Sequence, residues 1–437
     1  MQNSPVTYAE KAEPGRFRRW YSSLHPSLQL IGMQLYMPLF FIIMFSLCYI
    51  AAFNHIAPHD IPVAVNGPTA SIQKIADEAV PGGVEYLHYD DAASIREAVV
   101  TGEVGAGFDT ETHTILLAGA HQAQASAILP ELLSPLLGAP DNPPAVEDLA
   151  PLPAGDVGMT PMYLMLVMCI AGYLTAMFIG MMGGPLRHKT RLSVIVGLAL
   201  VLSLLIDVLV VPVLGAISGE FFLPLWGLMW AWIVAVGLAV NGLSYFFGRF
   251  ITMPALTIFV FVSIPASGAA FPEWLMPQPF RALNPFVVGS GITEMLKRMI
   301  YDVGPGYWRG WIMLVAYAGI GLLLAWVGKR RWENKRVHNI TTGATTMFGD
   351  AQAANRTFMI AERDEVLSRH GLESTETGTI MVVDHPGASR ADWNPDDDAQ
   401  RRGGGPDPTP TDPSFDSGPS GLESDFSSLP RPPKHRE

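Results

Sequence analysis

Residues 192–217 read LSVIVGLALVLSLLIDVLVVPVLGAI, and this stretch decides the fold class because Asp207 is its only ionisable residue. A helix needs roughly 20 consecutive apolar residues to cross the hydrocarbon core of a membrane. Further apolar stretches of this kind lie at 30–53, 160–182, 223–247, 250–271 and 308–328. The sequence therefore predicts an α-helical membrane protein with six transmembrane helices. Only 16% of the residues are charged, against roughly a quarter in soluble domains, which argues against an ordinary cytosolic enzyme.

The basic residues predict how these spans are oriented, since lysine and arginine collect in short cytoplasmic loops. They lie before the first span, in the loop after the second, between the fourth and fifth, and directly after the sixth. All of these positions fall on one side if the chain crosses six times. We therefore expect a multi-pass protein of the cell membrane, a bacterial plasma membrane by this interpretation, with both termini in the cytoplasm.

The segment between the first two spans, residues 54–158, has the length of a small domain. Its two basic and fifteen acidic residues give it a net charge of −13. Short strands are expected at 61–67, 84–89 and within 104–119, and helices at 71–80, 93–102 and 121–137, with Ser71 capping the first helix and Gly102 ending the second. Residues 138–158 are rich in Pro, Ala and Asp, which predicts a linker. We therefore expect residues 54–158 to form an extracytoplasmic α/β domain with a Pro-rich linker.

The two ends of the chain are expected in the cytoplasm. Residues 1–29 carry Phe17, Trp20, Tyr21 and Leu24 at helical spacing beside arginines, which favours an amphipathic helix at the lipid surface. An unstructured basic anchor is the alternative. Residues 333–437 form a tail with a short helix near 361–370 and a strand at 378–384. From about residue 386 the tail is too poor in apolar residues to fold, so we expect disorder. Residues 159–332 make the five-helix membrane domain.

Asp207 and Asn241 are the candidate residues of a transport pathway. A carboxylate such as Asp207 inside a span costs about 2.5–3.5 kcal/mol and must face the interior of the bundle or become protonated. It can contact substrate or relay protons. The structural alternative is a hydrogen bond between helices or across a dimer, for example to Asn241 in the fourth span.

Prolines interrupt the chain repeatedly between residues 265 and 285, so this segment cannot form a continuous helix. Irregular backbone at membrane depth requires cover from protein or water. The segment predicts either an outer gate or a plain turn between two helices. The candidate gate residues are Pro265, Gly268, Pro272, Pro277 and Pro285.

Three groups of residues resemble the ABC-2 type exporter permeases, in particular the YhgE/Pip-like branch. They are the run DAASIREAVVTGEVGAGF at 91–108, the turn GAHQ at 119–122, and the outer segment PASGAAFP at 265–272 with MPQPFRALNP at 276–285 and GITEMLKR at 291–298. The resemblance covers about residues 25–330. The outer domain is shorter than in long YhgE proteins.

The resemblance implies a homodimer or paired permease that exports an amphiphilic or lipid-like substrate with a separate ATP-hydrolysing subunit. It places contact with that ATPase at the inner loop, at Arg187, His188, Lys189 and Arg191, although a basic inner loop is also expected from topology alone. The chain has no GxxxxGK[ST] motif, so we expect no cofactor of its own, no catalytic residues and ATP only through the partner.

Two alternatives stay open. The chain is a membrane scaffold or surface receptor whose outer domain binds a partner, or a proton-driven exporter that uses Asp207. Membrane lipid is an expected partner. Nucleic acid is not, given the net charge of −12. The scattered histidines and the methionines of the second span predict no metal site.

Overall fold

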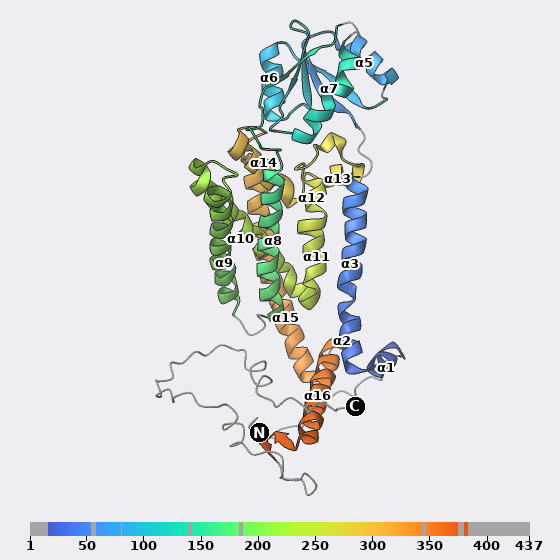
Figure 1. The fold of residues 1–437 in the computed structure, drawn as a ribbon, viewed down its shortest axis with the longest axis vertical. Coiled ribbons are helices and arrows are strands. Elements are labelled where there is room, and N and C mark those ends of the chain that lie inside the picture. The colour runs from blue at the N-terminus through green and yellow to red at the C-terminus, as the bar shows by residue number, and fades with distance from the viewer. Residues whose placement is uncertain are drawn as a thin grey trace, which may run out of the picture. The chain divides into compact units, whose positions relative to one another are not determined.

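The computed structural model describes residues 16–53, 58–79, 81–138, 142–182, 187–342, 347–374 and 380–382 (Figure 1). Its contacts divide the chain into two compact units, Met1–Arg356 and Thr357–Glu437. The first unit contains a bundle of long helices and an α/β domain (residues 58–148). The expected disordered part of the tail lies outside the described residues.

Within the described residues, five helical segments are long and apolar enough to cross a membrane. They are Pro26–Phe53, Thr160–Gly180, His188–Val213, Gly219–Phe247 and Trp308–Arg331. The prediction of a helical membrane protein is confirmed to this extent. The stretch predicted as a span at 250–271 contains a shorter apolar helix, Thr252–Ala266. That helix stops early because Gly268 adopts a left-handed conformation with φ +77°.

Several of these segments combine more than one helical element. The first comprises α2 (Pro26–Gln34), α3 (Tyr36–Met44), the π-helix η1 (Phe45–Ile50) and α4 (Ala51–Phe53). The next are α8 (Thr160–Met182), α9 (His188–Val208) with η2 (Leu209–Val213), η3 (Gly219–Phe221) with α10 (Phe222–Phe247), and α15 (Trp308–Thr342). The short helix consists of α11 (Thr252–Leu256), η5 (Thr257–Phe261) and α12 (Ser263–Ala266), preceded by η4 (Gly248–Ile251). The break between α2 and α3 precedes Pro38, which cannot donate a backbone hydrogen bond to Gln34.

Helix α10 lies at the centre of the bundle and packs against α8, α9 and α15. Glycines permit the close approach. A Cβ atom built on Gly321 of α15 would lie 2.4 Å from the carbonyl carbon of Leu238, and one on Gly172 of α8 would lie 2.7 Å from Cβ of Val236. Small residues at helix contacts are typical of membrane bundles, where close van der Waals packing replaces the hydrophobic effect.

The α/β domain has a five-stranded sheet in the order β2-β1-β3-β4-β5, with β3 and β4 antiparallel and the other pairs parallel. Its strands are β1 (Ile61–Val65), β2 (Val84–His88), β3 (Ala106–Asp109), β4 (Thr114–Leu117) and β5 (Ala145–Asp148), and its helices are α5 (Thr69–Ala79), α6 (Ala92–Thr101) and α7 (Ala123–Leu137). Helices α5 and α7 share one core with the sheet and α6 another, so the domain has three layers (Figure 1).

Local signals in the sequence explain most of this domain. Helix α6 is capped at its start by Asp91, whose carboxylate accepts a hydrogen bond of 2.7 Å from the Ser94 amide, and at its end by Gly102 with φ +76°. The expected cap at Ser71 is wrong, because α5 already begins at Thr69.

The linker prediction for 138–158 is also wrong in part, since β5 pairs with β4 inside it. This strand has no buried apolar face to reveal it. Polar contacts hold it instead, notably Glu147 with Arg96 at 2.7 Å.

The remaining elements lie at the chain ends and beside the bundle. Helix α1 (Arg16–Ser22) carries the exposed Trp20, while residues 1–15 lie outside the described residues. After α12 come η6 (Glu273–Leu275), α13 (Gln278–Leu283) and α14 (Val288–Tyr301). Helix α16 (Met347–Arg369) is longer than the helix expected near 361–370 and runs across the boundary of the units, and β6 (Leu372–Ser374) pairs antiparallel with β7 (Ile380–Val382) in the second unit.

Candidate functional site

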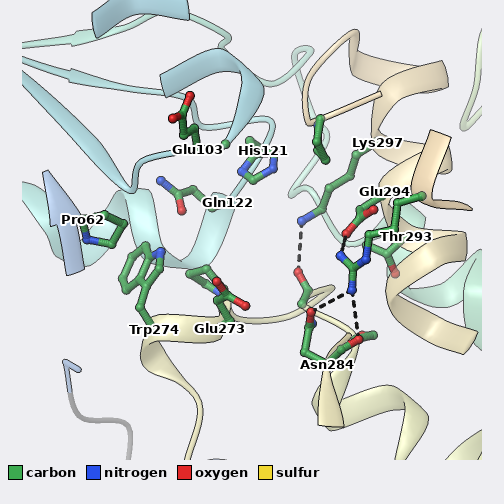
Figure 2. Close-up of a pocket in the computed structure, with 16 residues that line it drawn as sticks. Pro62, Glu103, His121, Gln122, Glu273, Trp274, Asn284, Thr293, Glu294 and Lys297 are labelled. Carbon is green, nitrogen blue, oxygen red and sulfur yellow. Dashed lines mark hydrogen bonds and ion pairs between the residues drawn. The ribbon is translucent and has the colours of Figure 1, made fainter. Parts of the chain in front are cut away.

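A polar cavity of about 220 Å³ lies where the α/β domain meets the helix bundle, and we call it the junction cavity. Four parts of the chain form it, one of them being Pro305 and Arg309 around the start of α15 (Figure 2). The α/β domain contributes His121 and Gln122, helix α14 contributes Thr293, Glu294 and Lys297, and the Pro-rich segment 265–285 contributes residues that include Gly268, Glu273, Trp274 and Asn284.

The Pro-rich segment forms the contact with the α/β domain. Trp274 and Leu275 are both buried and belong to the core shared by the sheet, α5 and α7. The Trp274 ring lies against Gly105, where a Cβ atom would come within 2.9 Å of it. The Trp274 carbonyl also accepts a hydrogen bond of 3.0 Å from the amide of His59. The segment is therefore an ordered part of the domain interface and not a free loop.

Helix α14 places two of its ionisable residues, Glu294 and Lys297, on the cavity side, because an interval of three residues keeps them on one face of the helix. The Lys297 side chain is buried, with 7% exposure, and its ammonium group donates a hydrogen bond of 3.1 Å to the Gly268 carbonyl. Burial lowers the pKa of Lys297 to about 8, while the nearby Glu294 opposes this shift.

Arg309, at the start of α15, connects three elements around the cavity. Its guanidinium group forms an ion pair with Glu294. It also donates to the backbone carbonyl of Asn284 at 3.1 Å and to the Asn284 side chain at 3.2 Å (Figure 2). The Asn284 amide in turn donates to the Ala266 carbonyl at 2.8 Å. The Pro-rich segment is thus fixed to α14 and α15 through partly buried, charge-assisted hydrogen bonds.

His121 forms the facing wall, at the turn between β4 and α7. Its ring occupies the space that the missing side chain of Gly102 leaves open, since a Cβ atom there would lie 2.4 Å from the ring. Burial, assisted by the positive charge of Lys297, lowers the pKa of His121 to about 3. The imidazole is therefore neutral at physiological pH. Its neighbour Gln122 donates a hydrogen bond to the Gly105 carbonyl.

Several buried polar atoms at the junction cavity have no hydrogen-bond partner among the described residues. They are Nδ1 of His121, Oγ1 of Thr293 and Oε2 of Glu294. Unsatisfied buried polar groups cost about 1–3 kcal/mol each, so a cavity that keeps three of them is suited to a polar ligand or ordered water.

The five candidate gate residues occupy different places. Gly268 and Pro272 line the junction cavity. Pro265 is buried within α12, Pro277 directly precedes α13 as its N-cap, and Pro285 lies in the turn that follows α13. The structure therefore brings two of the five to the cavity, and the prolines act mainly by ending and starting short helices.

Asp207 and Asn241 are both completely buried, but the expected hydrogen bond between them is wrong. Helices α9 and α10 run antiparallel, with Gly237 of α10 beside Ile195 of α9. Asp207 follows Ile195 by twelve residues, or about 18 Å of helix, toward the opposite end from Asn241. Both side chains lack hydrogen-bond partners among the described residues.

The inner loop divides into exposed and buried basic residues. Arg187 and Lys189 are exposed. His188 lies 3.1 Å from the Tyr245 hydroxyl through its Nδ1 atom, and Arg191 is buried with its guanidinium carbon 5.3 Å from the centre of the Tyr245 ring. Only the first two are thus available to a partner without rearrangement. Residues 183–186 lie outside the described residues.

Sequence reasoning missed the junction cavity although it singled out both stretches, 119–122 and 291–298, that supply its walls. The available signal was a set of ionisable residues, Glu294, Lys297 and Arg309, close to apolar spans. Nothing in the sequence pairs them with His121.

Comparison of the chain with family models, with curated proteins and with solved structures gave no match. The resemblance to ABC-2 permeases therefore stays a prediction.

Proposed function

We propose that this chain is the membrane subunit of an ABC-2-like exporter that moves an amphiphilic or lipid-like substrate out of the cell with a separate ATPase. The observation that carries the proposal is the junction cavity itself. A domain inserted after the first span covers one end of the helix bundle and encloses a cavity there that contains the buried Lys297 and the half-buried Glu294 and Arg309. Such a cavity provides a place for a polar headgroup beside a bundle that can accommodate apolar chains.

The proposal includes six membrane crossings, which the path of the chain supports. The α/β domain follows the first span and precedes α8, so the successive helices α8, α9 and α10 leave Phe247 on the side away from the domain. Trp274 is again in contact with the domain. The intervening 3₁₀ turn η4 and the helix Thr252–Ala266 together rise about 30 Å, which matches the thickness of a hydrocarbon core.

In the proposed orientation, with the basic loops in the cytoplasm, the α/β domain lies outside the cell and the loop with Arg187 and Lys189 lies inside. Two exposed cations on a short inner loop are suited to contact an acidic surface of an ATPase. Besides the ATPase, transport requires a second permease chain, in a homodimer or a paired permease. The second unit, Thr357–Glu437, lies in the cytoplasm in this proposal.

Purification of the tagged full-length chain from its native membranes after mild cross-linking tests the proposal. We expect mass spectrometry to find an ATPase with a GxxxxGK[ST] motif at near-stoichiometric abundance. The double variant Arg187→Glu, Lys189→Glu should recover at least about tenfold less ATPase than the wild type, since it replaces two favourable charge contacts by repulsive ones. The matched control is Arg331→Glu, an exposed charge reversal at the end of the last span, which should retain the ATPase.

The same experiment distinguishes the exporter from the alternative of a membrane scaffold or receptor. Recovery of an extracytoplasmic protein without any ATPase, and without a difference between the loop variant and its control, contradicts the exporter proposal and favours a receptor whose α/β domain binds a partner.

A further inference from the structure

The junction cavity offers more hydrogen-bond donors than the protein uses. The Lys297 ammonium group has three N–H bonds, and the described residues accept one of them, at the Gly268 carbonyl. The Thr293 hydroxyl is 98% buried without a partner, and Nδ1 of His121 is buried without one. Thr293 and Lys297 are four residues apart on α14, so they lie on the same face of the helix. All three residues line the same cavity, and His121 donates from Nδ1 in the tautomer that carries its proton there, so the set matches the donors of an oxyanion site.

The cavity lies at the ends of two apolar helices, where a membrane around these helices would have its headgroups. Gly268 follows the short apolar helix by two residues, and Arg309 is the second residue of the span Trp308–Arg331. Trp308 and Trp311 are exposed beside it, with 78% and 47% of their surface accessible. Tryptophan is enriched where membrane and water meet. A ligand in this cavity can therefore keep its acyl chains in the membrane.

The charges around the cavity favour an anion with one negative charge over one with two. Lys297 and Arg309 are the two buried or half-buried cations, and Glu294 already neutralises the second of them. The exposed carboxylates of Glu273 and Glu103 stand at the rim. The two cations and the single carboxylate of Glu294 leave a net charge of +1 inside the cavity, and the carboxylates at the rim repel a dianion such as a phosphomonoester.

We propose that the junction cavity binds a singly charged phosphodiester, whose non-bridging oxygens accept hydrogen bonds from Lys297, Thr293 and His121. Pockets for drug-sized ligands measure about 300–1,000 Å³, so the smaller cavity of about 220 Å³ accommodates a headgroup and not a whole lipid. Two sources present this group: a phospholipid in the membrane and a soluble glycerophosphodiester. The inference concerns binding alone and stands whether or not the chain works with an ATPase.

The test uses the delipidated full-length chain in detergent and measures bound ligand by native mass spectrometry. The probes are phosphatidylglycerol, phosphatidylethanolamine, diacylglycerol without phosphate, and soluble glycerophosphoglycerol. Retention of the phospholipids but not of diacylglycerol supports a lipid source, and retention of glycerophosphoglycerol supports a soluble source. Equal retention of diacylglycerol and the phospholipids, or no retention of any phosphodiester, overturns the proposal.

Variants of α14 locate the bound group. Lys297→Met keeps the length of the side chain and removes the charge, so the dissociation constant should rise at least about tenfold, as expected for a lost charge-assisted hydrogen bond. Thr293→Val replaces only the hydroxyl and should weaken binding by a smaller factor. It provides the test if Lys297→Met does not fold. The matched control is Arg298→Met, whose parent side chain pairs with Asp302 at 3.1 Å and does not line the cavity. Equal binding by Thr293→Val, Arg298→Met and the wild type contradicts the assignment.

Discussion

Gly102 is the residue at which backbone conformation and cavity geometry coincide. It needs a left-handed backbone to end α6, with φ +76°, and it leaves room for the His121 ring. Gly102→Ala should cost about 1–2 kcal/mol for the left-handed conformation and about 1–3 kcal/mol more for the overlap with the ring. Thermal unfolding of the full-length chain in detergent measures the loss. Gly82→Ala is the control, because Gly82 also has a positive φ of +66° but nothing within 4 Å. Equal losses in both variants would show that His121 does not occupy this space.

His121 makes the stability of the domain interface depend on pH. Its pKa falls from 6.5 to about 3 on burial, so the buried state holds the neutral ring. The contribution of this buried neutral ring to the free energy of unfolding is fully present above pH 6.5. It decreases by about 1.4 kcal/mol per pH unit as the pH falls from 6.5 toward 3. Melting temperatures between pH 7.5 and 5 should therefore fall more steeply for the wild type than for His121→Gln. The comparison is needed because Glu294, whose pKa burial raises, titrates in acid as well. Parallel curves would contradict a buried neutral His121.

At the scale of elements, the close contact between α10 and α15 depends on glycines, and Gly321 is the one that meets only backbone atoms of the partner helix. A Cβ atom on Gly321 would lie 2.4–2.6 Å from backbone atoms of Leu238 and Ala239, which cannot rotate away. Gly321→Ala should separate the helices and destabilise the bundle by about 1–3 kcal/mol. Gly319→Ala, two residues earlier with nothing within 4 Å, should be neutral or stabilise α15 by up to about 1 kcal/mol. Melting curves in one detergent test both, and a loss in Gly319→Ala as large as in Gly321→Ala would refute the packing argument.

The same scale shows what the sequence predicts and what it does not. Elements with a buried apolar pattern, such as α8 and the strands β1 and β2, agree closely with the sequence ranges. Strand β5 has no such pattern because all four of its residues are exposed. The junction cavity escaped prediction for a different reason: His121 and Lys297 are 176 residues apart in sequence, and hydrophobic periodicity carries no information on contacts over that separation.

For the whole molecule, the contacts of the α/β domain constrain the path of the chain more strongly than hydropathy does. The Gly304 amide donates to the Val100 carbonyl at 3.0 Å, and the Tyr301 hydroxyl donates to Asp156 at 2.5 Å. Residues near 274 and near 304 therefore lie on the same side as the domain. The segment Thr252–Ala266 is short for a span, yet it must return the chain across the bundle if α10 ends on the opposite side.

Cysteine labelling of intact cells tests this path, because six crossings place Arg331 inside and five place it outside. In a background with Cys48 and Cys169 replaced by alanine, Glu220→Cys should react with a membrane-impermeant maleimide, since the proposed orientation places the turn before α10 outside the cell. Lys189→Cys and Arg331→Cys should react only after the membrane is opened. Glu220 and Lys189 serve as the outside and inside controls, since neither position depends on whether Thr252–Ala266 crosses. Labelling of Arg331→Cys in intact cells, with both controls as expected, would reduce the crossings to five and contradict the proposed cytoplasmic location of the chain after the last span.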